Sequence, residues 1–188
     1  MDIGTNWKLV AALAAFAIRK EVVMYTPLIV ANTFIDRYGQ EGGLTHMKLQ
    51  KLVFFADGWS KAFDQTLVNE LPQVWRYGPV YRSLYDRLNV YGGQPIQKPV
   101  KPSPFSNNEG IIQRQQDADL VDWIWNRYGQ YSGGDLSTMT HNRGTPWQVM
   151  AERYSYRVPT HLEIDNEIFK SYFKSLASSE GLIGAAST

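Results

Sequence analysis

The chain is arranged around the segment Leu44-Thr-His-Met-Lys-Leu-Gln-Lys-Leu-Val-Phe-Phe-Ala-Asp-Gly-Trp59. Apolar residues recur there at the spacing of one helical face, at Leu49, Leu52, Val53, Ala56 and Phe63, and Phe55 and Trp59 form a second pair four residues apart. Thr45 stands just before this pattern, where its hydroxyl can accept a hydrogen bond from an amide of the first turn. We therefore predict a helix that is capped by Thr45 and buried on more than one side.

A second segment, Trp75-Arg-Tyr-Gly-Pro-Val-Tyr81, predicts a turn built from aromatic residues. Pro79 has no backbone N–H and biases the preceding Gly78 away from the helical region, so we expect the turn to precede a new helix. The apolar residues of that helix are Val80, Leu84 and Leu88, with Tyr81 and Tyr85 alongside, and Gly92-Gly93 is predicted to end it.

Helical signals continue along the rest of the chain. Thr26-Pro27 and Thr145-Pro146 each predict a helix start, with Thr as the N-cap and Pro as the first helical residue. Helices are predicted over 27–38, 120–128 and 136–141, from 146 onward, and over 168–176. Four prolines between 94 and 110 predict a surface loop, whereas 67–68 and 162–164 are candidates for extended structure. The fold class is therefore predicted to be mainly α, a compact multi-helix single domain with at most a minor short β pair.

The length of 188 residues suits one domain, which can bury about 70 % of its unfolded surface. We expect an N-terminal extension over 1–23, a helical domain over 24–177 and a flexible tail over 178–188. The apolar run 9–18 is shorter than the about 20 residues that a bilayer span needs, and it suits a short Ala-rich helix. A signal peptide is the alternative, and Arg19 and Lys20 directly after the run count against it.

The charges of the chain nearly cancel, with 19 Lys and Arg against 18 Asp and Glu. No global field therefore attracts nucleic acid or an anionic membrane, and we expect neither as a partner. The absence of cysteine excludes disulfides, thiolate metal sites and thiol nucleophiles. This composition is compatible with the cytoplasm, where we expect the protein to act.

Catalytic and metal-binding patterns are weak. His46, His141 and His161 lie at none of the spacings that zinc sites use, so no metal and no cofactor is expected. Ser137 and His141 are four residues apart and could meet on a helix, but no nucleophile-elbow motif surrounds the serine and no acid is placed to orient the imidazole. We expect Thr140 and His141 instead to hold the Pro146-Trp147 turn through hydrogen bonds, and we predict no catalytic residue and no enzyme.

Basic and aromatic residues alternate between residues 75 and 87, a mixture that is typical of protein interfaces and of base-stacking surfaces. The predicted partner-binding residues are Trp75, Arg76, Tyr77, Tyr81, Arg82 and Tyr85. In the alternative interpretation, Trp75 and Tyr77 belong to the core. A nucleic-acid-binding role would instead use Arg76, Arg82, Arg87, Lys98 and Lys101 on phosphates.

Three separated blocks resemble the Panacea domain of SocA-like antitoxins, a family often found in phage-associated genes. The blocks are Thr45-x-x-Lys48-Leu49-Gln50-Lys51-Leu52-x-Phe54-Phe55-Ala56-x-Gly58-Trp59, Trp75-x-Tyr77-Gly78-Pro79-Val80 and Leu136-Ser137-x-x-Thr140-His141-x-x-x-x-Pro146-Trp147. The resemblance covers roughly residues 25 to 175, and the motif residues to which we assign a structural role are Lys48, Leu49, Lys51, Phe55, Trp59, Gly78, Pro79, His141, Pro146 and Trp147.

The resemblance implies a mostly helical antitoxin that binds and neutralises a cognate toxin protein. It also implies a cellular protease or unfoldase as a second partner, if the antitoxin delivers the toxin for degradation. The alternative function, drawn from a different class, is a nucleic-acid-binding regulator of its own operon.

Overall fold

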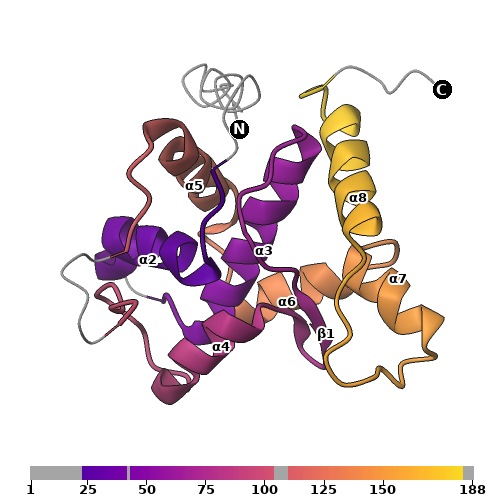
Figure 1. Cartoon of the computed structure of the whole chain (residues 1–188), viewed down its shortest axis with the longest axis horizontal. Helices are drawn as coiled ribbons and strands as arrows, with labels where there is room; N and C mark the ends of the chain where they lie inside the picture. The colour runs from indigo at the N-terminus through magenta and orange to yellow at the C-terminus, as the bar shows by residue number, and fades with distance from the viewer. Residues whose placement is uncertain (1–22, 42, 104–109, 184–188) are drawn as a thin grey trace.

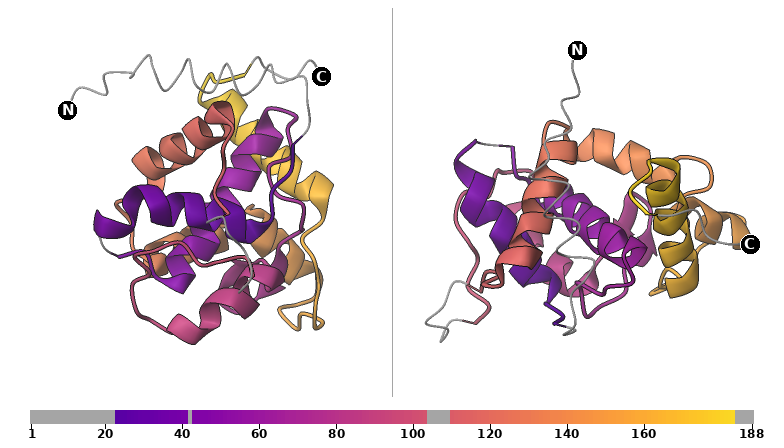
Figure 2. Two further views of the ribbon diagram at one scale, coloured as in Figure 1. Left: turned by 60° about the vertical axis from the view of Figure 1, so that its left-hand side comes forward. Right: turned by 90° about the horizontal axis from the view of Figure 1, so that it is seen from above.

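Helix α3 (His46–Ala62) runs through the middle of the computed structural model, which describes residues 23–41, 43–103 and 110–183 (Figure 1). The helices that contact it are α2 (Pro27–Tyr38), α4 (Arg82–Leu88), α5 (Gln115–Tyr128), α6 (Gly133–His141) and α8 (Asn166–Ser179). Helix α7 (Pro146–Arg153) packs on α6 and α8, and single 3₁₀ turns follow α2 (Gly39–Glu41) and α4 (Asn89–Tyr91). Figure 2 shows α3 enclosed between α2 and α5 on one side and α8 on the other. The mainly α fold class is confirmed.

The burial of α3 confirms the interpretation of its sequence. Every residue from Lys48 to Ala62 is buried, including the lysines, a glutamine and an aspartate. Thr45 caps the helix as predicted, because its Oγ1 accepts from the Lys48 N–H at 3.3 Å. The polar side chains of a helix that is buried on all sides need hydrogen-bond partners inside the protein. Several of the partners of α3 belong to the hairpin region over 73–81.

Aromatic rings fill the space between α3 and its neighbours. The Phe54 ring stacks on Phe169 of α8 at a centroid distance of 4.7 Å, and Phe55 stacks on Tyr128 of α5 at 4.3 Å. Aromatic pairs of this kind add about 0.5–1.5 kcal/mol each beyond the area that they bury. Phe173 of α8 is fully buried among these rings and lies against Gly58 of α3.

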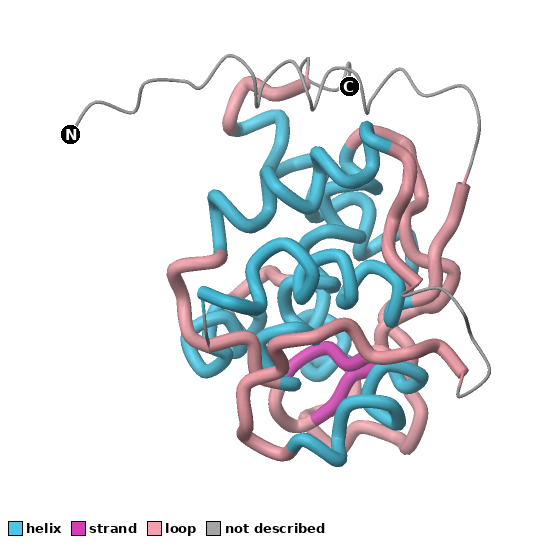
Figure 3. The backbone as a smooth tube through the Cα atoms, turned by 90° about the vertical axis from the view of Figure 1, so that its left-hand side faces the viewer, coloured by secondary structure: helices cyan, strands magenta, loops and turns pink. Residues whose placement is uncertain are grey.

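A two-stranded antiparallel hairpin, β1 (Gln73–Trp75) and β2 (Gly78–Val80), is the sheet of the described residues (Figure 3). Its register pairs Trp75 with Gly78. The prediction of a helix starting at the Gly78-Pro79 turn was therefore wrong by a few residues. Residues 78–80 are a strand, and α4 begins only at Arg82.

The two stretches expected to be extended contribute isolated bridges, Tyr25 with Val68 and Gln73 with Glu163. These bridges join remote parts of the chain rather than forming strands of their own. The residue pair 67–68 thus lies beside the start of the described chain, and 162–164 runs along the outer edge of β1.

The predicted helix starts at Thr26-Pro27 and Thr145-Pro146 are confirmed, whereas α5 begins at Gln115 and not at residue 120. Helix α6 begins earlier than predicted because Ser132 and Asp135 form a capping box ahead of Leu136. Helix α8 continues through Ser179, past the predicted domain end at 177. The expected extension before residue 23, the part of the loop at 104–109 and the end of the tail from 184 lie outside the described residues. Among the described residues, no helix is long and apolar enough to cross a membrane.

Candidate functional site

The backbone of the β1–β2 hairpin is held by side chains from helices α3 and α7. Lys51 Nζ, from α3, donates to the Pro79 carbonyl at 2.9 Å. Trp147 Nε1, from the first turn of α7, donates to the Trp75 carbonyl at 2.8 Å. These residues come from all three blocks of the sequence pattern, so the blocks meet in space at the hairpin.

The turn between the two strands is held in the same way by α6. Ser137 Oγ donates to the Tyr77 carbonyl at 2.9 Å, and His141 Nε2 lies 3.3 Å from the Arg76 carbonyl oxygen. Together with the contacts from α3 and α7, these side chains meet the carbonyls of Trp75, Arg76, Tyr77 and Pro79. The hairpin thus takes its position from three helices.

Glycine is required at residue 78. Its backbone has φ +99°, a conformation that residues with a side chain rarely adopt. A Cβ at this position would also lie 2.6 Å from Thr140 Oγ1 and 2.9 Å from Lys51 Nζ, which is too close. The glycine therefore lets the hairpin approach the α3–α6 contact closely enough for the Lys51 hydrogen bond.

Lys51 is 1 % exposed, and burial lowers the pKa of its ammonium group to about 7. The Pro79 carbonyl is its hydrogen-bond acceptor, and no carboxylate of the described residues offsets the cost of removing the charge from water. Lys51 is therefore a buried positioning residue that has no access to a ligand.

Gln50 and Asp57 fix the chain just after the hairpin. The Gln50 side-chain amide accepts from the Tyr81 N–H at 3.0 Å and donates to the Tyr81 carbonyl at 3.2 Å, and the Tyr81 hydroxyl donates to Asp57 Oδ2 at 3.0 Å. Burial raises the pKa of the Asp57 carboxyl to about 6, although Lys61 at 3.8 Å and the Tyr81 hydroxyl act in the opposite direction. Tyr81 is fully buried, so its prediction as a partner-binding residue on an exposed edge was wrong.

Ser137 and His141 form no catalytic dyad. The Ser137 hydroxyl hydrogen is directed at the Tyr77 carbonyl, and His141 Nδ1 lies 2.6 Å from the Ser137 carbonyl oxygen rather than from its hydroxyl. The His141 ring instead packs on Trp147 with a centroid distance of 3.8 Å. Both side chains therefore serve the structure of the hairpin.

Residues 140 and 141 contact the Pro146-Trp147 turn, but through a backbone carbonyl and a ring contact rather than through hydrogen bonds of both side chains. The Thr140 carbonyl accepts from Thr145 Oγ1 at 2.6 Å, and this hydroxyl also caps α7. His141 contributes through its ring contact with Trp147 and not through a hydrogen bond to the turn.

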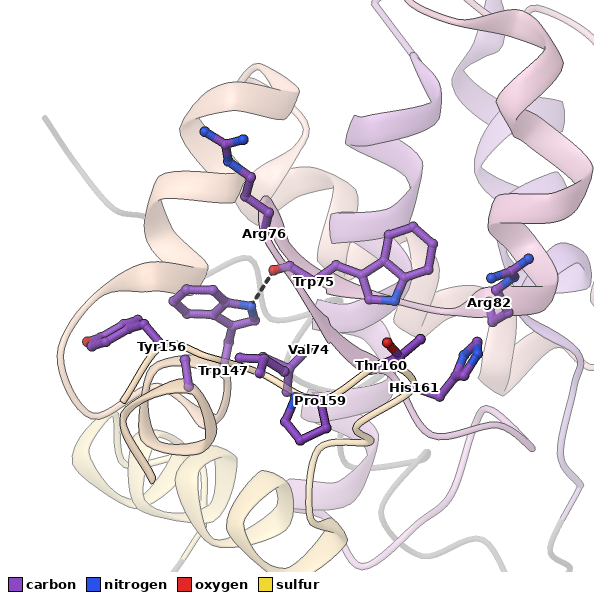
Figure 4. Close-up of a pocket in the computed structure, with 11 residues that line it drawn as sticks. Val74, Trp75, Arg76, Arg82, Trp147, Tyr156, Pro159, Thr160 and His161 are labelled. Carbon is purple, nitrogen blue, oxygen red and sulfur yellow. Dashed lines mark hydrogen bonds between the residues drawn. The ribbon is translucent and has the colours of Figure 1, made fainter. Parts of the chain in front are cut away.

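Between β1, α7 and the loop that follows α7 lies a groove of about 710 Å³ (Figure 4). Its apolar surface comes from Val74 of β1, Ala151 of α7, and Val158 and Pro159 of the loop. The aromatic side chains of Trp75, Trp147 and Tyr156 line it as well. A concave, largely apolar surface of this size is typical of a ligand or partner site.

The groove has an aromatic end and a cationic end. In Figure 4, Tyr156 and Trp147 lie at one end, whereas Arg82 and His161 lie together at the other, beyond the Trp75 indole. The Arg82 guanidinium carbon lies 5.8 Å from the centroid of the Trp75 ring. Arg76 lies on the Trp147 side in the same view, so the guanidinium of Arg82 is the cation at the end away from Trp147 and Tyr156.

The loop that forms one wall has an unusual backbone. The loop residues with positive φ are Ser155, Tyr156 and His161, at 50°, 59° and 62°. These values lie in the left-handed region, which residues other than glycine adopt only at a cost in energy. Such positions are frequent at ligand-binding surfaces. Two of these residues, Tyr156 and His161, line the groove.

Apart from the buried Tyr81, the predicted partner-binding residues lie in or near the groove or on the open surface. Trp75, Arg76 and Arg82 line the groove, and the half-buried Tyr85 supports the Trp75 ring from a centroid distance of 4.7 Å. Tyr77 lies outside the groove and is 61 % exposed, which excludes the alternative that placed it in the core. Sequence reasoning missed the other wall, formed by Trp147 and residues 156–161; alternating aromatic and basic residues at 153–157 are the signal that could have indicated it.

The remaining motif residues are structural in their placement. Lys48 Nζ donates to the Gly129 carbonyl at 2.6 Å and lies over the Trp125 ring. The buried members that pack in the core or against the hairpin are Leu49, Phe55, Trp59 and Pro146.

Within residues 23–41, 43–103 and 110–183, no three His, Asp or Glu side chains gather as a metal site would require. The basic residues named for phosphate contact, Arg76, Arg82, Arg87, Lys98 and Lys101, are exposed. Two of them also contact other groups of the chain, since Arg82 Nε pairs with Asp86 at 3.0 Å and Arg87 donates to the Lys101 carbonyl.

Comparisons with known proteins identify the same family that the three sequence blocks resemble. Residues 49–148 match the family described as "Antitoxin SocA-like, Panacea domain". The chain is 26% identical over 151 residues to the protein named "Antitoxin SocA" of Caulobacter vibrioides (strain NA1000 / CB15N), with 77% of this chain and 80% of that protein covered. No solved structure matches the chain.

Proposed function

The chain belongs to the Antitoxin SocA-like, Panacea domain family, and on this premise we propose that it acts as a non-enzymatic antitoxin that binds and neutralises a cognate toxin protein in the cytoplasm. The observation that carries the proposal is the groove beside the hairpin, which the motif residues of the family hold in place. Trp, Tyr and Arg, which line it, are the residues that most often dominate binding energy between proteins.

The roles of the polar motif residues support a binding function over a catalytic one. The side chains of Ser137 and His141 are engaged by backbone carbonyl oxygens, and Lys51 is buried. A protein whose motif residues hold a scaffold, while an exposed groove remains open, is suited to recognition rather than to chemistry.

The proposal is tested by growth. Expressing the adjacent toxin gene alone should stop growth, and co-expressing this chain should restore it. The two proteins should also co-purify. Unimpaired growth with the adjacent gene alone, or growth arrest that this chain does not relieve, would count against the antitoxin function.

The route of neutralisation is tested by following the amount of toxin. If the chain blocks the toxin directly, the toxin level should stay constant while growth recovers. If the chain delivers the toxin to a protease or unfoldase, the toxin should disappear on co-expression and persist in strains that lack the responsible protease.

The alternative function, regulation of its own operon, is tested by mobility shift with the upstream DNA. The near balance of 19 basic and 18 acidic residues weighs against it, because affinity for DNA depends largely on phosphate neutralisation. A salt-sensitive, sequence-specific complex of the chain alone would favour the regulator.

A further inference from the structure

We propose that the groove binds an extended segment of the toxin in which an aromatic or aliphatic anchor residue lies close to an acidic residue. The inference rests on the proposed antitoxin function and specifies the part of the partner that this site recognises. Its basis is the separation of the groove into an aromatic end and a cationic end (Figure 4).

The aromatic end takes the anchor. Trp147 is held rigidly, because its indole N–H donates to the Trp75 carbonyl at 2.8 Å and its ring packs on His141. Tyr156 faces it across a centroid distance of 6.5 Å and is itself 61 % exposed. An apolar side chain placed beside these rings and against Val158 and Pro159 would lose contact with water on several sides, which is the main source of affinity at such a site.

The cationic end takes the carboxylate. Arg82 lines this end beside His161, whereas Arg76 lies on the Trp147 side in Figure 4, and no acidic residue lines the groove. Arg82 uses only Nε for Asp86, which leaves its two η nitrogens without a hydrogen-bond partner among the described residues. A guanidinium group with donors to spare, resting over an aromatic ring, favours a carboxylate that it can meet with two hydrogen bonds.

The dimensions of the groove suit a few consecutive side chains of a peptide. A volume of about 710 Å³ is large for a single side chain, and the rim is formed by exposed residues on the loop side. Tyr156 and His161, at opposite ends of the groove, both have left-handed backbone conformations, which persist only where the surrounding structure enforces them. A site ordered in advance loses less entropy on binding, so it can hold a short segment firmly.

The test uses the purified toxin and an array of overlapping peptides that cover its sequence. The parent chain should bind one segment that contains an apolar anchor and an acidic residue. Arg82→Glu and Tyr156→Asn should each weaken binding of the toxin and of that segment by at least about tenfold. Asn is chosen at residue 156 because it tolerates the left-handed backbone while removing the ring.

Matched controls lie beside the groove. Arg87→Glu changes an exposed arginine on the same helix as Arg82, and Tyr154→Asn changes a 41 % exposed tyrosine two residues from Tyr156. Neither residue lines the groove, so both variants should bind within about threefold of the parent. A charge exchange completes the design: replacing the acidic residue of the toxin segment by Lys should abolish binding to the parent and restore it to Arg82→Glu.

The results distinguish a failure of the proposed binding groove from a failure of the antitoxin function. If the toxin binds the parent and all four variants alike, the groove is not its site, although the antitoxin function stands. If the bound segment has no acidic residue, or the charge exchange restores nothing, the assignment of the cationic end is overturned. If the parent binds no toxin and relieves no growth arrest, the function and the inference fail together.

Discussion

Gly58 of α3 lies directly against the ring of Phe173 of α8, so that a Cβ on residue 58 would lie under 3.0 Å from the Phe173 ring. The ring cannot easily move aside, because it is fully buried and meets Trp59 and Phe169 edge to face at 5.7 and 5.6 Å. The packing of Phe173 against the central helix thus depends on the absence of a side chain at residue 58.

Gly58→Ala should therefore destabilise the protein, although alanine is the better helix former. The gain in helix propensity is about 1 kcal/mol, whereas overpacking a close-packed core typically costs about 1–3 kcal/mol, and here a rigid aromatic ring is displaced. Because the Cβ would overlap the ring, we expect a cost near the upper end of this range and a net loss of up to about 2 kcal/mol in the free energy of unfolding, measured by urea titration.

Gly134→Ala is the matched control for this prediction. Gly134 also lies in a helix, and a Cβ there would meet nothing closer than Ser132 Oγ at 3.6 Å, so this variant should be as stable as the parent or more stable. In the Gly58→Ala background, Phe173→Leu should recover part of the loss by making space. Equal stability of both alanine variants would contradict the steric argument.

The buried Lys51 predicts a particular dependence of stability on pH. Its pKa is lowered to about 7 in the folded state from an ordinary value of 10.5, so between these pH values the unfolded chain binds more protons than the folded one. The free energy of unfolding should therefore rise as the pH increases from about 7 to 10.5, by about 5 kcal/mol. Below pH 7 the full cost of burying the charge is present.

Lys51→Met should remove this rise. Methionine fills a similar volume without a charge, so the curve of unfolding free energy against pH should be flatter above pH 7 than that of the parent. The contribution of Asp57 does not interfere: its pKa is raised to about 6, so its effect on stability falls between pH 3.8 and 6. Parallel curves for the parent and Lys51→Met above pH 7 would show that Lys51 keeps an ordinary pKa.

The local parts of the fold could be predicted from the sequence because their signals are local. The helix starts at Thr26-Pro27, Thr45 and Thr145-Pro146 are encoded by residues that cap and begin a helix by themselves. The hairpin could not be predicted with equal success. Strands of three residues are too short to show an alternating pattern, and their position depends on remote donors such as Lys51 and Trp147.

The candidate site could be predicted only in part for the same reason. Helical spacing places Tyr81 and Tyr85 on one side of α4, but it does not tell which of them faces the core. Asp57 and Gln50, remote in the sequence, draw Tyr81 inward. Trp75, Arg76 and Arg82 were found because they are neighbours in the sequence, whereas the opposite wall joins them only in the folded chain.

Ser137→Ala tests the absence of catalysis. The substitution removes one hydrogen bond, from Ser137 Oγ to the Tyr77 carbonyl, which should cost about 0.5–1.5 kcal/mol of stability. Relief of growth arrest by the variant should equal that of the parent when both are present in equal amount. A folded, abundant Ser137→Ala chain that failed to relieve the arrest would restore the catalytic interpretation.

The final prediction separates Tyr81 from Tyr85. Tyr81→Phe keeps the buried ring but removes the hydroxyl that donates to Asp57, so we expect a loss of about 1–3 kcal/mol in stability and unchanged affinity for the toxin per folded molecule. Tyr85→Ala removes the ring that supports Trp75 at the groove, so toxin binding should weaken by about 1–3 kcal/mol. Melting temperature and affinity measured side by side distinguish the two effects. Weaker binding by folded Tyr81→Phe, or parental binding by Tyr85→Ala, would place the toxin contact elsewhere than the Trp75 side of the groove.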